Sequence, residues 1–416
     1  MFALFALTTV SVAGDGGSTY SMLGIGDILW SSGVRSIGMG YAGTALTSAQ
    51  YLNLGAPATW SRISRIRLEG GLEYEGFNST DGIASRYLSR IEFQEASIGI
   101  PVSTEHGIVL VFGVSPYSRV NYDTYQSGVG YSGSDTISYK MHHVGIGGIG
   151  IATLGTSWSP LTDVTVGAAF NYYFGTVDYF RTYIPDTSTY GGMSIDQKTS
   201  YRGSGATFGI SFSSLGQISS VFRPLSLGLT VSTRSTLTSP HQSMLGFGPD
   251  IATGASEYDT TAEQAGQVIL PIRYTLGAAY TASDRVVVAA DYSMQKWSTT
   301  KIDGVTPSNL RDMSRFGIGL ERIPARDLGA SLTDRVSLRL GMAITNTYFS
   351  PYNTGITEWD LTGGFSTPLS GDARLHVALV YGWRGTTNGN LSKDHIFRLN
   401  ASISLSELWF IRSDEE

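Results

Sequence analysis

Apolar residues alternate with small or polar residues in one segment after another along this chain. From Val164 onward, every second position is apolar: Val164, Val166, Ala168, Phe170, Tyr172 and Phe174. The same arrangement returns at residues 286–295, 336–345 and 375–384. Successive side chains point to opposite faces of a β-strand, so each segment predicts a strand with one apolar face. A soluble sandwich would carry charges on its outward face, whereas both faces of these segments are nearly free of charge.

The composition excludes several classes of protein. Only 15% of the 416 residues are charged, compared with about 25% in typical soluble proteins. The net charge is −6 and no block of Lys or Arg occurs, so nucleic acid is excluded as a partner. The chain has no cysteine, which excludes disulfides and thiolate metal sites. Beyond the N-terminus no run of about 18 apolar residues occurs, so a membrane would have to be crossed by strands.

About fourteen such segments predict an all-β fold, a transmembrane antiparallel β-barrel. We expect its strands at residues 66–77, 84–101, 107–121, 136–158, 164–184, 195–214, 225–235, 267–282, 285–299, 308–324, 335–350, 353–368, 373–388 and 392–412. Connections after even-numbered strands are mostly short, and those after odd-numbered strands are longer, with the longest at residues 236–266. Short turns lie on the periplasmic side of outer-membrane barrels, so both termini are expected in the periplasm. An even strand number also lets the sheet close without free edges.

The residues before the first predicted strand lack this alternation. Residues 1–14 form an apolar run that ends in two small residues, which resembles the end of a signal peptide. Residues 15–63 are rich in Gly, Ala and Ser, and we interpret them as an N-terminal plug inside a barrel of residues 64–412. The alternative is a disordered periplasmic leader, which the apolar residues of this segment disfavour. Residues 413–416 are expected to form a charged periplasmic tail.

Three short sequences in the predicted plug resemble a known family. They read Tyr-Ser-Met-Leu-Gly-Ile-Gly-Asp at residues 20–27, Arg-Ser-Ile-Gly-Met-Gly-Tyr-Ala-Gly-Thr-Ala at 35–45 and Asn-Leu-Gly-Ala-Pro-Ala at 53–58. They resemble the plug of the FadL-type outer-membrane transporters for long-chain fatty acids, particularly the divergent members from the Bacteroidota. The resemblance assigns these residues to the plug: Gly24, Gly26, Asp27, Arg35, Gly38, Gly40, Asn53 and Pro57.

The resemblance implies a plugged, fourteen-stranded barrel that passes hydrophobic compounds inward, commonly through a lateral opening in its wall. The chain departs from the family pattern in two places. Ala56 replaces the Asn that usually precedes Pro-Ala, so the hydrogen bonds of that side chain are either absent or supplied by Asn53. At the other end, Trp409 and Phe410 are followed by a charged tail, whereas outer-membrane barrels commonly end on an aromatic residue.

Several charged or titratable side chains are expected to point into the barrel. By alternation, these residues lie on the non-lipid faces of their strands: Arg273, Asp291, Arg339, His376, Arg384 and Arg398. Arginine can hold a carboxylate through two parallel hydrogen bonds, so we interpret the four arginines and the histidine as candidate contacts for a fatty-acid head group. The alternative is that these cations pair with Asp291 and with plug acids such as Asp27, and so lock the plug. Arg35 fits either interpretation.

One sequence matches a nucleotide-binding motif and another could suggest a metal site, but neither has the surrounding structure that such a site needs. Residues 145–150 match G-x-G-x-x-G, but they lie inside a predicted strand with no helix after them to bind a pyrophosphate. His142 and His143 are adjacent in one strand and point to opposite faces, so they cannot share a metal ion. No Gly-x-Ser-x-Gly sequence stands at a strand-to-helix turn. We therefore expect no enzyme activity, no metal and no cofactor.

Two functions from different classes are compatible with these features. The first is passive transport of hydrophobic small molecules, such as fatty acids, across the outer membrane, with exit through the barrel wall into the lipid. The second is a docking subunit for a protein-export system, because the type IX secretion shuttle resembles the same fold. Co-purifying lipid would support the first, and a stoichiometric protein partner with an empty lumen would support the second.

Overall fold

The computed structural model describes residues 17–30, 33–132, 135–187, 191–216, 219–248, 257–325, 331–389 and 391–407. The expected signal peptide, the charged tail and the aromatic pair at 409–410 lie outside these residues. Before the first long strand, the chain forms four short elements: η1 (Thr19–Met22), β1 (Asp27–Ile28), α1 (Val34–Ile37) and η2 (Pro57–Arg62). None of the helices in the described part of the chain is long and apolar enough to span a membrane.

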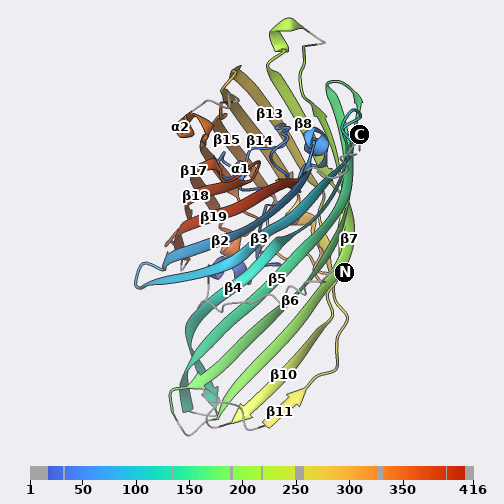
Figure 1. The fold of residues 1–416 in the computed structure, drawn as a ribbon. Coiled ribbons are helices and arrows are strands. Elements are labelled where there is room, and N and C mark those ends of the chain that lie inside the picture. The colour runs from blue at the N-terminus through green and yellow to red at the C-terminus, as the bar shows by residue number, and fades with distance from the viewer. Residues whose placement is uncertain are drawn as a thin grey trace.

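After these elements the chain forms one antiparallel sheet that closes on itself (Figure 1). Its strands are β2 (Ile66–Thr80), β3 (Ser85–Ser103), β4 (Ile108–Ser132), β5 (Asp135–Leu161), β6 (Val164–Pro185), β7 (Gly192–Phe212), β8 (Leu225–Ser232), β9 (Ser235–Thr238), β10 (His241–Gly248), β11 (Glu257–Thr260), β12 (Gln267–Leu270), β13 (Arg273–Ser283), β14 (Val286–Gln295), β15 (Met313–Arg322), β16 (Ser337–Asn346), β17 (Thr357–Pro368), β18 (Arg374–Gly385) and β19 (Lys393–Glu407). The barrel closes where β19 pairs with β2 along the full length of both strands. Four short helices lie in the connections: η3 (Ser220–Phe222), η4 (Trp297–Thr299), α2 (Leu332–Arg335) and η5 (Pro351–Asn353).

The wall has fourteen strands, which confirms the predicted fold. The seventh wall strand consists of β8, β9 and β10, and the eighth consists of β11, β12 and β13, which pair with them segment by segment. The prediction of a loop at residues 236–266 is therefore wrong in part, because three short strands lie within it or overlap its start. Breaks at Ser239–Pro240 and Pro271–Ile272 interrupt the alternation there, since proline cannot donate a hydrogen bond to a neighbouring strand.

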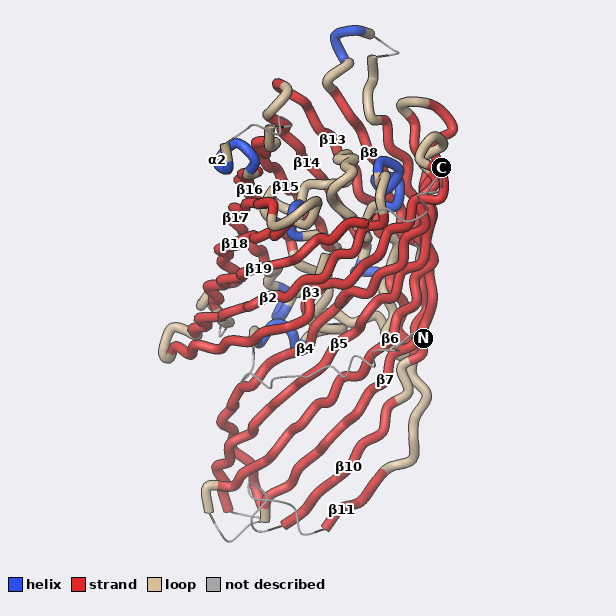
Figure 2. Tube along the Cα trace, viewed as in Figure 1, coloured by secondary structure: helices blue, strands red, loops and turns tan. Residues whose placement is uncertain are grey.

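Four neighbouring strands continue far beyond the rest of the wall. β4 to β7 have 25, 27, 22 and 21 residues, whereas β14, β15 and β16 have 10 each. Together with β10 and β11 their ends form a sheet that projects away from the barrel, which we call the outer sheet (Figures 1 and 2). The alternation predicts that the third strand ends at residue 121, but β4 continues to Ser132. Outside lipid neither face of a sheet must be apolar, so alternation does not mark this extension.

The two faces of the wall differ in polarity, as a membrane barrel requires. On β16, Leu338 and Leu340 are 48% and 69% exposed, whereas Arg339 between them is 2% exposed. The same alternation on β17 exposes Leu361 and buries Asp360. Apolar side chains therefore face outward, and the charged side chains of these strands face the interior.

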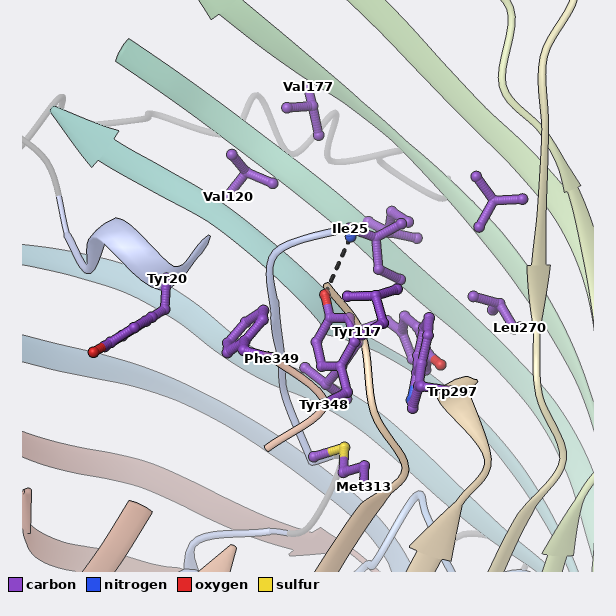
Figure 3. Packing of buried hydrophobic residues seen from close by; sticks show 14 of the residues in the cluster. Tyr20, Ile25, Tyr117, Val120, Val177, Leu270, Trp297, Met313, Tyr348 and Phe349 are labelled. Carbon is purple, nitrogen blue, oxygen red and sulfur yellow. Dashed lines mark hydrogen bonds between the residues drawn. The ribbon is translucent and has the colours of Figure 1, made fainter. Parts of the chain in front are cut away.

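Residues 17–30 and 33–62, which we call the plug, pack against the inward side chains of the wall. The largest buried apolar cluster joins Tyr20 and Ile25 of the plug to Tyr117, Trp297 and Tyr348 of the barrel (Figure 3). A second cluster surrounds the fully buried Trp60 of η2, with wall residues that include Val109, Val111 and Ala169. The plug is thus fixed by apolar contacts at both of its ends.

Candidate ligand path through the barrel

Backbone groups of the plug are hydrogen-bonded by side chains of the wall. Tyr348 Oη accepts a bond from the N–H of Ile25 at 3.1 Å (Figure 3). The same hydroxyl donates to the carbonyl oxygen of Gly26 at 2.5 Å. On another side of the barrel, Asp291 Oδ2 accepts from the N–H groups of Gly43 and Thr44 at 3.0 and 2.9 Å. The locking alternative pairs Asp291 with a cation. In the structure, the Asp291 side chain instead holds the plug by accepting hydrogen bonds from the plug backbone.

At Gly40 the plug backbone lies directly against the wall. Its φ is +63°, and a Cβ atom there would lie 2.3 Å from the carbonyl oxygen of Met342 and 2.6 Å from that of Ile318. Only glycine fits this position without moving backbone. Its N–H donates to Thr362 Oγ1 at 2.9 Å. Gly38 lies nearby, with Gly364 and Arg339 around it.

The other plug residues named by the resemblance have local or packing roles. Asn53 Oδ1 accepts from the N–H of Gly55 at 3.1 Å, and its carbonyl accepts from Trp60 Nε1 at 2.7 Å. Pro57 begins η2 and packs against Gly167 of β6. Gly24 and Gly26 both have positive φ, at +61° and +87°.

Two of the predicted arginines bind acids from the plug and from neighbouring strands. Arg384 Nη1 lies 2.6 Å from Asp27 Oδ1 and 3.3 Å from Glu358 Oε2. Arg398 lies 2.7 Å from Glu75 and 3.0 Å from the same Glu358. Arg384 is buried and Arg398 is 13% exposed, and acids surround both guanidinium groups. This geometry matches the locking alternative for Arg384 and Asp27.

A third predicted arginine shares an acid with the plug. Glu321 is 2.8 Å from Arg339 and 2.6 Å from Arg35, so it bridges the wall and α1. Arg339 also donates to Ser366 Oγ at 2.7 Å, and His376 Nδ1 lies 2.7 Å from the same oxygen. The structure therefore brings Arg35, Arg339 and His376 into one polar cluster at the plug surface.

Two lumen arginines differ from these because no carboxylate oxygen of the described residues lies within 4.0 Å of their guanidinium nitrogens. Arg273 is one of the predicted contacts, and Arg315 is not. Nε and Nη2 of Arg273, and Nε and Nη1 of Arg315, are buried without a hydrogen-bond partner among the described residues. Both guanidinium groups lie over the ring of Trp30, at 4.7 and 4.6 Å, and Arg315 also lies 3.5 Å from the ring centre of Tyr41. We call Arg273, Arg315, Trp30 and Tyr41 the arginine cluster.

β3 and β4 separate halfway along their lengths. In the part of the chain that the structure describes, they pair only between residues 96–103 and 108–114. Beyond this point β3 stays paired with β2 and β4 with β5, so the two strands diverge (Figure 2). We call this separation the wall opening. It is flanked by exposed apolar side chains of β2, β3 and β5: Leu72, Ile91 and Ile146.

Two cavities of about 90 Å³ each lie between the plug and the wall. The first is lined by residues 53–56 of the plug and by Arg273. The second lies behind the wall opening, between Gln94 of β3 and Ser115 of β4. Each has room for only a few water molecules, so a long-chain ligand can pass only if the plug moves. Residues of the arginine cluster border both cavities: Trp30, Tyr41 and Arg315.

The G-x-G-x-x-G sequence and the adjacent histidines His142 and His143 all lie within a regular β-strand. Residues 145–150 are within β5, where Ile149 is buried and Ile146 is exposed. His142 Nε2 lies 2.8 Å from Asp123 Oδ1, and its ring stacks on that of Tyr125. Among the described residues, no three His, Asp or Glu side chains are grouped so as to hold a metal ion.

Sequence reasoning missed Arg315 and the acids that bind the other arginines. The signal for Arg315 was available, because it alternates with the outward Phe316 inside a predicted strand. A similar signal marks Glu73 and Glu75, which are charged residues in the middle of the first predicted strand. The pairing of Glu75 with Arg398 depends on the closure of the barrel, which brings β19 beside β2, whereas Arg119 reaches Glu73 and Glu75 from β4.

Several solved structures share this fold. The CymD monoaromatic hydrocarbon channel is 15% identical, with a TM-score of 0.60 over 92% of this chain and 99% of that one. The toluene transporter TbuX of Ralstonia pickettii is 16% identical, with a TM-score of 0.61 over 91% and 98%. A FadL homologue from Pseudomonas aeruginosa is 12% identical, with a TM-score of 0.57 over the same shares. At these identities the similarity shows the fold, so the FadL-type resemblance is confirmed at that level.

The amino-acid sequence gives the family itself. No curated protein is similar enough to match. A family model described as BamG matches residues 1–414, which is almost the whole chain. The protein therefore belongs to the BamG family, and its barrel has the fold of the FadL-type channels.

Proposed function

We propose that this protein conducts hydrophobic small molecules with an acidic head group, such as fatty acids, passively across the outer membrane. In this proposal both termini lie in the periplasm and the outer sheet faces the cell exterior. The solved structures with this fold that are described as a hydrocarbon channel and a toluene transporter support transport of hydrophobic molecules. The apolar outward face of the wall supports a location in lipid.

The observation that carries the proposal is the alignment of the two cavities with the wall opening. The first cavity contains Arg273, the second ends between β3 and β4, and Arg315 borders both. A molecule that passes from one cavity to the other therefore reaches the opening without leaving the space between plug and wall. Because the surface beside the opening is apolar, exit into the membrane would cost an alkyl chain little.

The arginine cluster gives the path its preference for an acidic head group. Arg273 and Arg315 present buried N–H groups that no described protein group accepts, and a carboxylate can accept two of them at once. The ring of Trp30 lies against both guanidinium groups, with Tyr117 also against Arg273 and Tyr41 also against Arg315, so the guanidinium edges remain as donors. Arg339, Arg384 and Arg398 remain proposed contacts only for a ligand that displaces their acids.

Replacing both free arginines by glutamine is expected to lower palmitate uptake and to leave toluene uptake unchanged. The double variant Arg273→Gln/Arg315→Gln loses charge-assisted hydrogen bonds of roughly 1.5–3 kcal/mol each, so palmitate flux should fall at least about tenfold. Toluene has no head group, and its flux should stay within about twofold. Proteoliposomes with a fatty-acid reporter inside measure the first flux, and radiolabelled toluene measures the second.

Arg202→Gln serves as the matched control, because Arg202 is exposed on β7 and lines neither cavity. Its palmitate flux should equal that of the unmodified protein. An equal fall in palmitate and toluene flux in the double variant would contradict the head-group assignment. Absence of flux for both molecules through the unmodified protein would contradict transport itself.

The outer sheet favours a second candidate function, that of a docking subunit. It projects beyond the neighbouring strands, and the outer half of β4 pairs only with β5 and the plug in the described part of the chain (Figure 1). Replacing residues 124–141 by an Asn-Gly turn would shorten this sheet without touching the lumen. A stoichiometric protein partner that is lost on shortening, together with no palmitate flux through the unmodified protein, would support docking over transport.

A further inference from the structure

The edge of β4 at the wall opening is covered by the plug, in the place that β3 leaves. β1 pairs with β4 in antiparallel register, with Asp27 opposite Arg119 and Ile28 opposite Ser118. The N–H of Leu29 donates to the carbonyl of Tyr117 at 2.9 Å. The segment 27–29 therefore acts as a short additional strand of the wall.

The contact continues beyond this strand. Ser21 Oγ accepts from the N–H of Asn121 at 3.1 Å and donates to its carbonyl at 2.9 Å. Unpaired backbone groups cost several kcal/mol each where water is excluded, so an uncovered β4 edge would be unfavourable beside lipid. The plug residues satisfy that edge from position 117 to position 121.

A set of ion pairs spans the wall opening from β4 to β3 and β2. Arg119 reaches Glu92 of β3, and it lies 2.8 Å from Glu75 and 3.3 Å from Glu73 of β2. Its side chain is 7% exposed, and these acids are its counter-charges. We call these four residues the Arg119 clasp. The clasp crosses the opening at the residue that pairs with Asp27 of β1.

From these contacts we propose that β1 is a removable strand that closes the wall opening, and that the Arg119 clasp keeps it in place. Release of β1 from β4 connects the second cavity to the membrane, while the rest of the plug stays bound to the wall. This inference rests on the proposed transport function, because it assigns a closing device to the same path.

Cysteine pairs test this directly, because the chain has no cysteine of its own. Ile28 and Ser118 form a register pair next to the bond from Leu29 to Tyr117, where side chains of antiparallel strands approach most closely. Their Cα separation there, roughly 4.5 Å, suits a disulfide. Oxidised Ile28→Cys/Ser118→Cys should lose palmitate flux at least about tenfold, and reduction should restore it.

A second disulfide separates release of β1 from movement of the whole plug. Ser61 Oγ and Thr165 Oγ1 are 3.1 Å apart, so Ser61→Cys/Thr165→Cys ties the far end of the plug to β6. Its palmitate flux should be unchanged on oxidation. Equal loss of flux in both oxidised variants would overturn the proposal, and so would full flux in oxidised Ile28→Cys/Ser118→Cys. Absence of flux in the unmodified protein would instead overturn the proposed function.

The rate of thiol labelling at position 28, which does not depend on transport, tests whether the Arg119 clasp keeps β1 in place. In Ile28→Cys, the thiol should react slowly with a maleimide, because Ile28 is 9% exposed. Adding Arg119→Gln should speed the reaction at least about tenfold, since β1 then leaves β4 more often. Adding Arg86→Gln should not, because its pair with Asp123 spans the same strands but is half exposed. Equal rates with and without Arg119 would overturn the role of the clasp.

Discussion

Replacing Glu321 by glutamine is expected to lower the free energy of unfolding of the barrel by about 3–5 kcal/mol. Glu321 is 1% exposed and holds Arg339 at 2.8 Å and Arg35 at 2.6 Å. The substitution leaves the buried guanidinium of Arg339 and the largely buried guanidinium of Arg35, which belongs to the plug, without a counter-charge. Urea unfolding in detergent, followed by the change in gel mobility of the folded barrel, measures the loss.

Glu105→Gln provides the comparison, because Glu105 is exposed in the turn between β3 and β4. It should change the free energy of unfolding by less than about 0.5 kcal/mol. Adding Arg35→Met to Glu321→Gln removes one unpaired cation, so the double variant should be more stable than Glu321→Gln alone. A Glu321→Gln protein as stable as the Glu105→Gln protein would contradict the assigned ion pairs.

The barrel could be predicted from the sequence because lipid imposes a rule on every wall strand. Leu340 must face lipid and Arg339 must not. Because neighbouring side chains point to opposite faces, this requirement produces alternating apolar and polar residues in each wall strand. This alternation is required only in the parts of the strands that contact lipid. On β4 the predicted strand ends at residue 121 and the continuation to Ser132 was missed, whereas the predicted ranges for β5, β6 and β7 already extend into the outer sheet. β9 and β10 escaped prediction because Pro240 between them interrupts the alternation.

The candidate site could be predicted only in part. Alternation placed Arg273, Arg339 and Arg384 in the lumen, because a side chain's face depends only on its own strand. Whether an arginine is free or bound depends on residues far away in the sequence, such as Asp27 for Arg384. The wall opening was likewise hidden, since it depends on where β3 and β4 stop pairing.

Replacing Arg384 by methionine is expected to destabilise the barrel by about 3–5 kcal/mol, and this separates the two interpretations of the lumen arginines. Its guanidinium lies within 3.5 Å of Asp27, Glu358 and Asp394, and all three acids would lose a buried partner. A double-mutant cycle with Asp27→Asn isolates the bond between wall and plug. We expect a coupling energy in the range of about 0.5–3 kcal/mol, measured by urea unfolding.

The same variant predicts a specific pattern of transport. If Arg384 locks the plug, its loss loosens β1, whose Asp27 it holds, and palmitate and toluene flux should rise together. If Arg384 instead binds a head group, palmitate flux should fall while toluene flux is unchanged, as expected for Arg273 and Arg315. Because the two interpretations predict different patterns of flux, one set of proteoliposomes decides between a lock and a ligand contact. Arg202→Gln again supplies the baseline, since that arginine is exposed and lies outside both cavities.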